Sequence, residues 1–270
     1  MELYLGSGGY TNDDWKGILY PPGAPSSEYL ESYARYFNAV ELESPFYNIP
    51  GKKAFEGMVR KSGGHVHFAV KAHRAMTHMR NADEDGYRRL RVSVKPLQEA
   101  GVLGPFLAQF PRSFHNTPDN NRYLHELVSR FEGETLAIEF RNPKWHTPEV
   151  EASLRDKGVT WVSIDYPEIA GMGTRRLVTT SPIAYIRLFG RNEKKWYAGK
   201  TAKEKHDYRY STEELRFWVE EIVARRDELD QAYLILLNTP RFSAGYNLTE
   251  LQQMFEEHGL DGGVRDIPAG

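Results

Sequence analysis

Residues 67–80 read His67-Phe-Ala-Val-Lys-Ala-His-Arg-Ala-Met-Thr-His-Met-Arg80, and this stretch decides the fold. Its apolar run, Phe68 to Val70, predicts a short buried strand. The strand leads without a turn signal into a lysine, two histidines and two arginines within ten residues. Since α/β enzymes display reactive groups at the carboxyl ends of strands, the stretch predicts a strand that ends in a functional site. The alternative is a solvated basic loop, because clustered lysines and arginines are mostly exposed.

The pattern of a short apolar strand that ends in polar residues recurs along the chain. The strand-like segments are residues 3–6, 39–43, 68–70, 103–111, 136–141, 159–165, 183–190 and 232–238. Helical segments alternate with them, and the clearest are residues 52–61, 120–131, 148–157, 211–225 and 248–258. This alternation predicts one α/β domain, a parallel eight-stranded (β/α)8 TIM barrel over residues 1–260. A doubly wound open sheet is the alternative fold. Residues 261–270 are glycine-rich and are predicted to form a flexible tail.

Composition limits the classes of function. The 270 residues are 40% hydrophobic, which is ample for a packed core, and their formal charge of -2 gives no global attraction to nucleic acid or acidic membranes. The absence of cysteine excludes disulfides, thiolate nucleophiles and cysteine-ligated metal sites. No apolar run is long enough to span a bilayer, and the first residues enter a strand at once. We therefore expect a cytoplasmic protein with no membrane partner.

The second strand places two carboxylates on one face. In residues 39–43, Val40 and Leu42 share one side of the strand, while Glu41 and Glu43 share the other. In a barrel this second side points into the interior near the mouth, where a charge is costly unless it is paired or functional. Glu41 is therefore predicted to be catalytic or to form an internal salt bridge, and Glu43 is expected closer to the rim.

Polar residues at the strand ends make a candidate active site. We predict that Lys71, Arg74, Arg141 and Arg187 bind an anionic group, phosphate or carboxylate, because the guanidinium fork matches both. Glu41, Lys71 and Glu139 are the predicted catalytic residues, since neighbouring lysines and carboxylates shift each other's pKa as acid–base catalysis requires. The predicted substrate-binding residues are Tyr10, Tyr47, His73, Arg74, His78, Gln109, Arg141, Trp145, Asp165, Arg187 and Asn238.

A purely structural role for the same charges is the competing interpretation. Glu41 with Lys71, and Glu139 with Arg141 or Arg187, could be internal ion pairs that fill the barrel. A Schiff base on Lys71 is a further hypothesis, which requires a desolvated amine.

Two other functions use the same strand ends. Glu41, Glu139, Asp165 and His73 or His78 could bind a divalent metal for phosphodiester hydrolysis. No tight ligand spacing supports this, and the nearby arginines oppose a cation, so we assign no metal ligands among the site residues and keep a divalent metal as the alternative cofactor. A non-catalytic barrel that binds a ligand or nucleic acid is the other alternative. It rests on the aromatic residues near the strand ends and on the basic loop over residues 191–210, which we expect to be mobile and solvated.

Several motifs carry a resemblance to a known family. They are Gly6-Ser-Gly-Gly-Tyr10 with Trp15-Lys-Gly17, Val40-Glu41-Leu with Phe46-Tyr47, Val70-Lys71-Ala with Arg74 and Thr77-His78, Glu139-Phe-Arg141 with Pro143 and Trp145, Tyr185-Ile-Arg187-Leu with Gly190, and Asn238. In this order they resemble the YecE-like family (domain of unknown function 72). The resemblance implies a TIM barrel and no assigned activity. The family usually has tryptophan at Tyr10, asparagine at Glu43, threonine at Pro45, histidine at Phe189 and a second asparagine at Thr239.

Together these features predict a single-domain TIM-barrel enzyme, of hydrolase or lyase type, that acts on a small anionic ligand.

Overall fold

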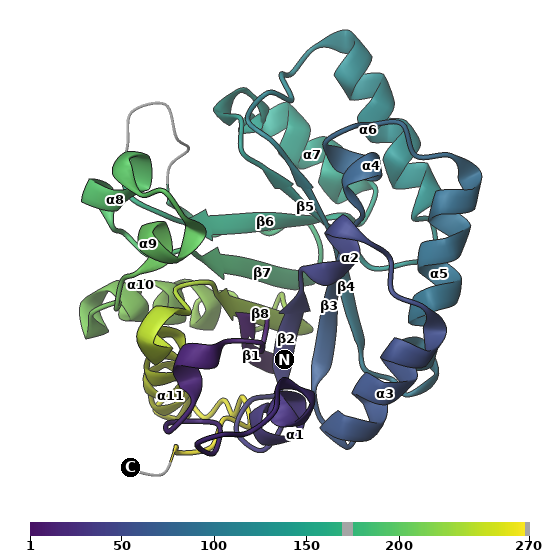
Figure 1. Ribbon diagram of the computed structural model, residues 1–270. Coiled ribbons are helices and arrows are strands. Elements are labelled where there is room, and N and C mark those ends of the chain that lie inside the picture. The colour runs from purple at the N-terminus through teal and green to yellow at the C-terminus, as the bar shows by residue number, and fades with distance from the viewer. Residues whose placement is uncertain (169–174, 268–270) are drawn as a thin grey trace.

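Eight parallel strands close into a barrel in the computed structural model, which describes residues 1–168 and 175–267. They pair in chain order, and β1 also pairs with β8, so the sheet has no free edge (Figure 1). The predicted (β/α)8 barrel is confirmed and the open sheet is wrong. The strands are β1 Glu2–Gly8, β2 Ala39–Leu42, β3 His67–Lys71, β4 Leu103–Phe110, β5 Leu136–Phe140, β6 Thr160–Asp165, β7 Ile183–Leu188 and β8 Gln231–Leu236.

Helices surround the barrel (Figure 1). The α-helices are α1 Tyr29–Tyr33, α2 Ser44–Tyr47, α3 Lys52–Ser62, α4 Arg74–Thr77, α5 Glu84–Glu99, α6 Pro118–Arg130, α7 Pro148–Asp156, α8 Glu193–Ala198, α9 Ala202–His206, α10 Thr212–Val223 and α11 Ser243–Glu256. Short 3-10 turns are η1 Asp13–Trp15, η2 Ser26–Glu28, η3 Pro143–Trp145 and η4 Pro240–Phe242. In the described parts of the chain, no helix is long and apolar enough to cross a membrane.

Side-chain caps fix where several helices begin. The hydroxyl of Thr117 accepts the amide of Asn120, so α6 starts at Pro118, two residues before the predicted start. Ser211 and Glu214 form the predicted capping box at α10. The loop predicted over residues 191–210 contains two short helices, α8 and α9, whose N-terminal amides bond to the side chains of Asn192 and Thr201.

Successive side chains of each strand point alternately into the barrel interior and toward the surrounding helices. Near the amino-terminal ends the interior is aromatic, because Tyr4, Tyr185 and Tyr233 stack with ring centroids 4.5 and 5.7 Å apart. Near the carboxyl ends it is charged, through side chains on β2, β3, β5 and β7. At Gly6 a side chain would meet the carbonyl oxygen of Ala39 at 1.9 Å, so the close approach of β1 to β2 requires glycine. The polar interior therefore opens at the end where TIM barrels carry their sites.

Part of the segment predicted to be a flexible tail packs against the barrel. The amide of Arg265 donates to the carbonyl of Tyr36 at 3.0 Å, and Gly262 donates to the side chain of Gln252 at 3.0 Å. The side chain of Val264 is buried among these contacts. Residues 268–270 lie outside the described residues, as do residues 169–174 of the connection between β6 and β7.

Candidate functional site

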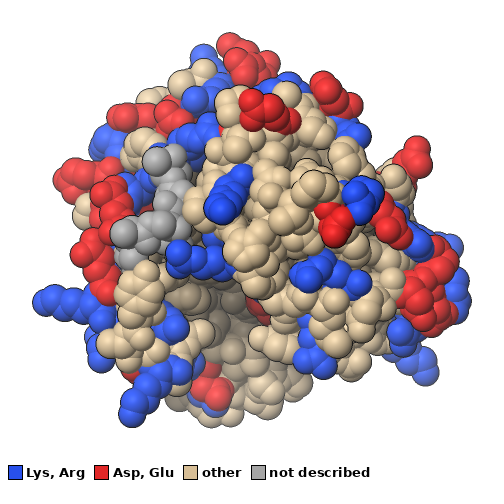
Figure 2. Space-filling view, turned by 90° about the horizontal axis from the view of Figure 1, so that it is seen from above, with Lys and Arg blue, Asp and Glu red and all other residues tan. Residues whose placement is uncertain are grey.

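A cavity of about 330 Å³ opens at the carboxyl ends of the strands. Seen from above, this face is hollowed, and lysine and arginine side chains lie around the hollow (Figure 2). β2, β3, β5, β7 and β8, or the residues directly after them, contribute walls, and α9 closes one side. The lining residues are Gly8, Asn12, Glu43, Tyr47, Lys71, Arg141, Arg187, Phe189, Ala202, Lys203, His206, Leu237, Thr239 and Pro240.

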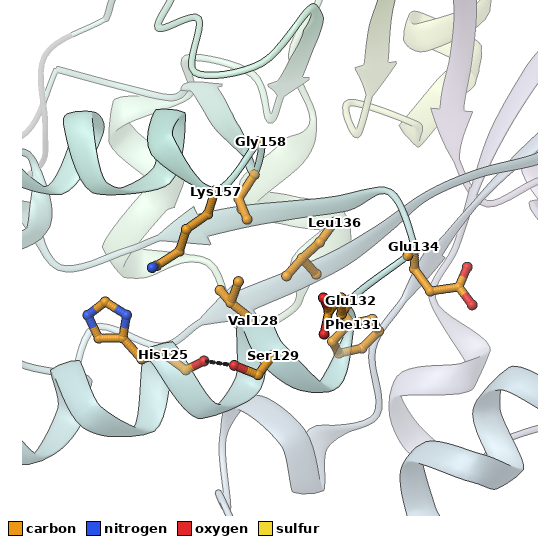
Figure 3. A pocket seen from close by; sticks show the side chains of 11 residues that line it. His125, Val128, Ser129, Phe131, Glu132, Glu134, Leu136, Lys157 and Gly158 are labelled. Atoms are coloured by element: carbon orange, nitrogen blue, oxygen red, sulfur yellow. Dashed lines mark hydrogen bonds between the residues drawn. The ribbon is translucent and has the colours of Figure 1, made fainter.

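A second hollow lies at the opposite end of the barrel (Figure 3). The end of α6 and the segments that lead into β5 and β6 line it, with His125 and Lys157 among its side chains. Its volume of about 380 Å³ is slightly larger. Size does not decide between the two hollows, because the amino-terminal face of a TIM barrel usually serves stability. The buried charges are at the other end, and we place the functional site there.

Arg187 is the centre of the charged interior. It is 1% exposed, and its Nη2 atom lies 2.6 Å from Oε1 of Glu41 and 3.2 Å from Oε1 of Glu43. Its Nη1 atom donates to Oε2 of Glu139. The guanidinium therefore connects carboxylates from β2, the segment after β2, and β5. The predicted pair of Glu139 with Arg187 is present.

Lys71 pairs with the outer carboxylate of the second strand. Its ammonium lies 2.6 Å from Oε2 of Glu43 and 4.7 Å from the ring centroid of Phe46. The predicted direct pair of Lys71 with Glu41 is absent from these contacts, because Glu41 bonds to Arg187 and to the hydroxyl of Tyr185, at 2.7 Å. Glu43, one interior position closer to the rim, reaches the lysine instead.

Arg141 and Arg187 share one aromatic ring. Their guanidinium carbons lie 4.3 and 4.8 Å from the centroid of Phe189, which also lines the cavity. Nε of Arg141 donates to Glu139, and its Nη atoms have no hydrogen-bond partner among the described residues. Nε of Arg187 is buried and also has no partner there. Buried donors are nearly always bonded in folded proteins, so Nε of Arg187 is an exception within the charged cluster. The Nη atoms of Arg141, whose side chain is 21% exposed, leave hydrogen-bonding capacity at the cavity wall.

The two fully buried glutamates have opposite pKa shifts. Burial alone would raise the pKa of Glu139, but Arg141 and Arg187 outweigh it and lower the pKa to about 2. Burial raises the pKa of Glu41, and the negative charge of Glu43 adds to the increase. Arg187 opposes that increase, but its charge is shared among three carboxylates. Glu139 is therefore a fixed anion, and Glu41 is the buried carboxylate that takes up a proton more readily.

Other predicted site residues lie near the cavity without lining it. The ring of His78 contacts Phe46 with centroids 4.8 Å apart, and its Nδ1 lies 3.0 Å from the hydroxyl of Thr77. Gln109 is half-buried on β4, in register with Glu139. Tyr10 is half-buried beside Tyr33. Tyr47 differs from these three residues, because it lines the cavity, and 64% of it is exposed.

Three predicted residues face the layer between barrel and helices. The indole of Trp145 is fully buried and donates to the carbonyl of Phe114 at 2.7 Å. Asp165 is fully buried against Arg191 and Trp218. The amide of Asn238 donates to the carbonyl of Tyr208 at 2.9 Å. With these hydrogen bonds the three side chains stabilise the fold around the cavity and do not line it.

His73 and Arg74 lie outside the cavity, at the start of α4. Nδ1 of His73 accepts the amide of Ala75 at 3.3 Å, which caps this helical turn. The same histidine lines a separate surface hollow with Arg88 and Arg89 of α5. Arg74 is exposed. Residues 67–80 thus bring Lys71 to the cavity, whereas the next two basic residues, His73 and Arg74, lie outside it.

Comparison with known proteins agrees with this architecture. Residues 4–269 match the model of the family described as "Protein of unknown function DUF72". This chain is a member of the DUF72 family. It is 26% identical to UPF0759 protein YunF of Bacillus subtilis, over 94% of this chain and 95% of that protein. A DUF72 structure from Thermotoga maritima is 32% identical and superposes with a TM-score of 0.86, covering 95% of this chain and all of that one. A DUF72 structure from Enterococcus faecalis, 23% identical, covers 94% and 95% with a TM-score of 0.84, and this likeness concerns the fold.

Three of the departures expected within DUF72 lie in the cavity wall, at Glu43, Phe189 and Thr239. Glu43, where asparagine was expected, supplies the carboxylate that pairs with Lys71. Phe189, where histidine was expected, supplies the ring under both arginines. At the position of Thr239, the backbone carbonyl accepts the indole of Trp15 at 2.8 Å. At Glu43 and Phe189 the wall of this DUF72 barrel therefore carries a carboxylate and an apolar ring in place of the expected amide and imidazole.

His206 is the residue of this DUF72 site that sequence reasoning missed. It ends α9, lines the cavity, and its ring lies 5.4 Å from that of Phe189. Burial and the positive charges of Arg141 and Arg187 lower the pKa of His206 to about 4. The imidazole is therefore neutral near pH 7 and able to accept a proton. Its position in a long basic loop, far in sequence from any strand end, gave no signal of this role.

The low pKa of His206 predicts a pH dependence of stability. An unfolded histidine binds a proton below about pH 6.5, whereas the folded one does not until about pH 4. The contribution of His206 to the free energy of unfolding is therefore complete above pH 6.5 and is lost as the pH falls toward 4. Urea unfolding of wild type and His206→Gln at several pH values should show a shallower decline for the variant in this window. Equal slopes would contradict the shift.

Metal binding has little support from the arrangement of this DUF72 site. Within residues 1–168 and 175–267, no group of three or more histidine, aspartate or glutamate side chains is placed to hold a metal ion. Glu41 and Glu139 accept hydrogen bonds from Arg187, and Asp165 accepts them from Arg191. A cation would have to displace these arginines.

Proposed function

We propose that the mouth of this barrel binds a small organic anion and performs acid–base chemistry on it. The observation that carries the proposal is the pair of Nη atoms of Arg141, a cavity-lining residue, which have no hydrogen-bond partner among the described residues. A carboxylate or phosphate oxygen would satisfy them with charge-assisted hydrogen bonds. Arg141 is held by Glu139 and by the Phe189 ring, so the donors are fixed before the ligand arrives.

The surroundings of these donors would strengthen their attraction for an anion. Arg187 is 1% exposed and the side chain of Arg141 is 21% exposed, so little water screens them. The ammonium of Lys71 lines the same cavity, as does that of Lys203 at the rim. The apolar walls formed by Phe189, Leu237 and Pro240 suit the carbon skeleton of an organic ligand.

Acid–base chemistry requires proton carriers that face the ligand. Glu43 and His206 both line the cavity. Lys71 and Arg187 outweigh the effect of burial and lower the pKa of Glu43, while the pKa of His206 is about 4. Both groups are therefore deprotonated near pH 7, and we assign to them the acceptance of a proton from the ligand. Glu41 and Glu139 are fully buried and do not line the cavity, so they act as positioning residues that hold Arg187.

The proposal is tested with a thermal-shift panel of organic carboxylates, phosphate esters and sugar phosphates. Ligand binding to the folded state raises the melting temperature by mass action. Arg141→Gln should weaken the affinity for the active compound by about tenfold or more, because a hydrogen bond to a charged group contributes roughly 1.5–3 kcal/mol.

The matched control is Arg122→Gln, which removes an exposed guanidinium of α6 that pairs with Asp119. It should leave both the melting temperature and the ligand-induced shift close to wild type. The proposal is refuted if no anion of the panel raises the melting temperature of the wild type. It is also refuted if Arg141→Gln leaves the ligand-induced rise in melting temperature unchanged.

A further inference from the structure

The charges around the cavity balance in the ligand-free barrel. Three cations, Lys71, Arg141 and Arg187, face three carboxylates, Glu41, Glu43 and Glu139. Lys71 pairs with Glu43, Arg141 pairs with Glu139, and Arg187 contacts all three carboxylates. A ligand that brings negative charge into this cluster therefore adds uncompensated charge, which is costly in a poorly hydrated interior.

We propose that the cavity binds a monoanionic carboxylate together with one proton from solvent, and that His206 holds this proton. The inference rests on the proposed function and names its ligand class. The carboxylate contributes one negative charge, the imidazolium contributes one positive charge, and the cluster stays neutral. A phosphate monoester, which is mostly a dianion at pH 7 because its second pKa is about 6, would need a second proton and is disfavoured.

The geometry identifies His206 as the group that takes the proton. The rings of His206 and Phe189 meet edge to face, with an interplanar angle of 65°. The guanidinium groups of Arg141 and Arg187 lie over the ring of Phe189 as well. Burial is the largest effect that opposes protonation of His206. The positive charges of Arg141, Arg187 and Lys205 add to it, and Glu43 favours protonation. An anion on the two guanidinium groups would offset these positive charges and so favour the protonated imidazole.

Glu41 is the carboxylate of the cluster whose pKa is raised, by burial and by the charge of Glu43, but it is fully buried and does not line the cavity, so the ligand meets His206 and not Glu41. The other titratable groups leave the charge balance unchanged. Tyr185 donates its hydroxyl to Glu41 and is held neutral by burial. Burial, Lys71, Arg141 and Arg80 lower the pKa of His78, so it too is neutral at pH 7. At the rim, Lys203 lies 3.1 Å from Asp14 and these charges offset each other.

Isothermal titration calorimetry with benzoate and phenyl phosphate tests the inference on the full chain. The two probes share an aromatic ring and differ in the charge of the anionic group at pH 7. Titrations in buffers of different ionisation enthalpy measure the protons taken up per ligand. We expect benzoate to bind at least about tenfold more tightly than phenyl phosphate at pH 7. Its Kd should rise by up to tenfold per pH unit, with nearly one proton taken up, above about pH 5.

The variant His206→Gln separates this inference from the proposed function. It should bind benzoate with little proton uptake, and its Kd should vary less than about twofold between pH 5 and 6.5. His125→Gln, at the opposite end of the barrel (Figure 3), is the matched control and should behave as wild type.

The possible failures point to different errors. If neither these probes nor any anion of the thermal-shift panel binds, the proposed function fails and the inference with it. If benzoate binds without proton uptake, or phenyl phosphate binds more tightly, the inference is overturned while the anion site stands. If proton uptake persists in His206→Gln, the assignment of the proton to His206 is wrong.

Discussion

Replacing Arg187 with methionine is expected to lower the free energy of unfolding by about 3–5 kcal/mol, because it leaves buried carboxylates without their counter-charge. Glu41 and Glu139 are fully buried, and both bond to this guanidinium. In this variant Arg141 still pairs with Glu139, and Lys71 still pairs with Glu43. Most of the lost stability therefore comes from the uncompensated negative charge of Glu41. Urea unfolding at pH 7 measures the effect.

A neutral double variant shows whether lost charge or lost packing causes the effect. Arg187→Met combined with Glu41→Gln removes the uncompensated carboxylate while keeping its shape, and it leaves Arg141 paired with Glu139 and Lys71 paired with Glu43. If uncompensated charge is the cause, the double variant should recover more than half of the stability lost in Arg187→Met. An unfolding free energy as low as that of the single variant would instead assign the loss to packing around the arginine. Arg122→Met, on the surface of α6, should change stability by less than about 0.5 kcal/mol.

Strand alternation made much of the fold and part of the site predictable. The period of two in residues 39–43 placed Glu41 and Glu43 on one face, and both do point to the interior cluster around Arg187. The same rule applies to β5 and β7, where Glu139, Arg141 and Arg187 alternate with buried apolar residues. Because the barrel closes in chain order, residues distant in sequence meet at one end of it.

The partners within the site could not be predicted from the sequence. Glu41 and Glu43 are equivalent by alternation, and only their different heights along the barrel decide that Lys71 reaches Glu43. Asp165 and Asn238 lie at or just after the ends of their strands, and their side chains point outward toward the helices. The polar character of a strand end does not show whether its side chain points outward or into the barrel. His206 comes from α9, whose path across the mouth is set by the pair of Lys203 with Asp14 near its start and by contacts of Asp207 directly after its end. Such placement depends on packing and has no local signature.

The outward-facing carboxylate of Asp165 is nevertheless expected to control the cavity. Asp165→Asn should lower the free energy of unfolding by about 3 kcal/mol, at the lower end of the range for breaking a buried ion pair, because Arg191 keeps a second partner in Glu214, at 2.9 Å. In the wild type, Asp165 accepts Arg191 at 2.9 and 2.7 Å and the indole of Trp218 at 2.7 Å. An asparagine of the same shape would turn an amide group toward these donors and leave one of them unsatisfied.

Anion binding should weaken in the same variant, although Asp165 touches no part of the cavity. Arg191 follows β7 and precedes α8 and α9, so its bonds to Asp165 fix the start of the segment that brings Lys203 and His206 to the mouth. Benzoate titration at pH 5 should therefore show a lower affinity and a smaller proton uptake. Asp156→Asn, an exposed residue at the end of α7, is the matched control and should leave stability within about 0.5 kcal/mol of wild type. Should Asp165→Asn lose stability but bind benzoate as wild type does, the position of α9 is independent of Arg191, and Lys203 with Asp14, Arg241 with Asp207, and Asn192 with Asp207 must hold it in place.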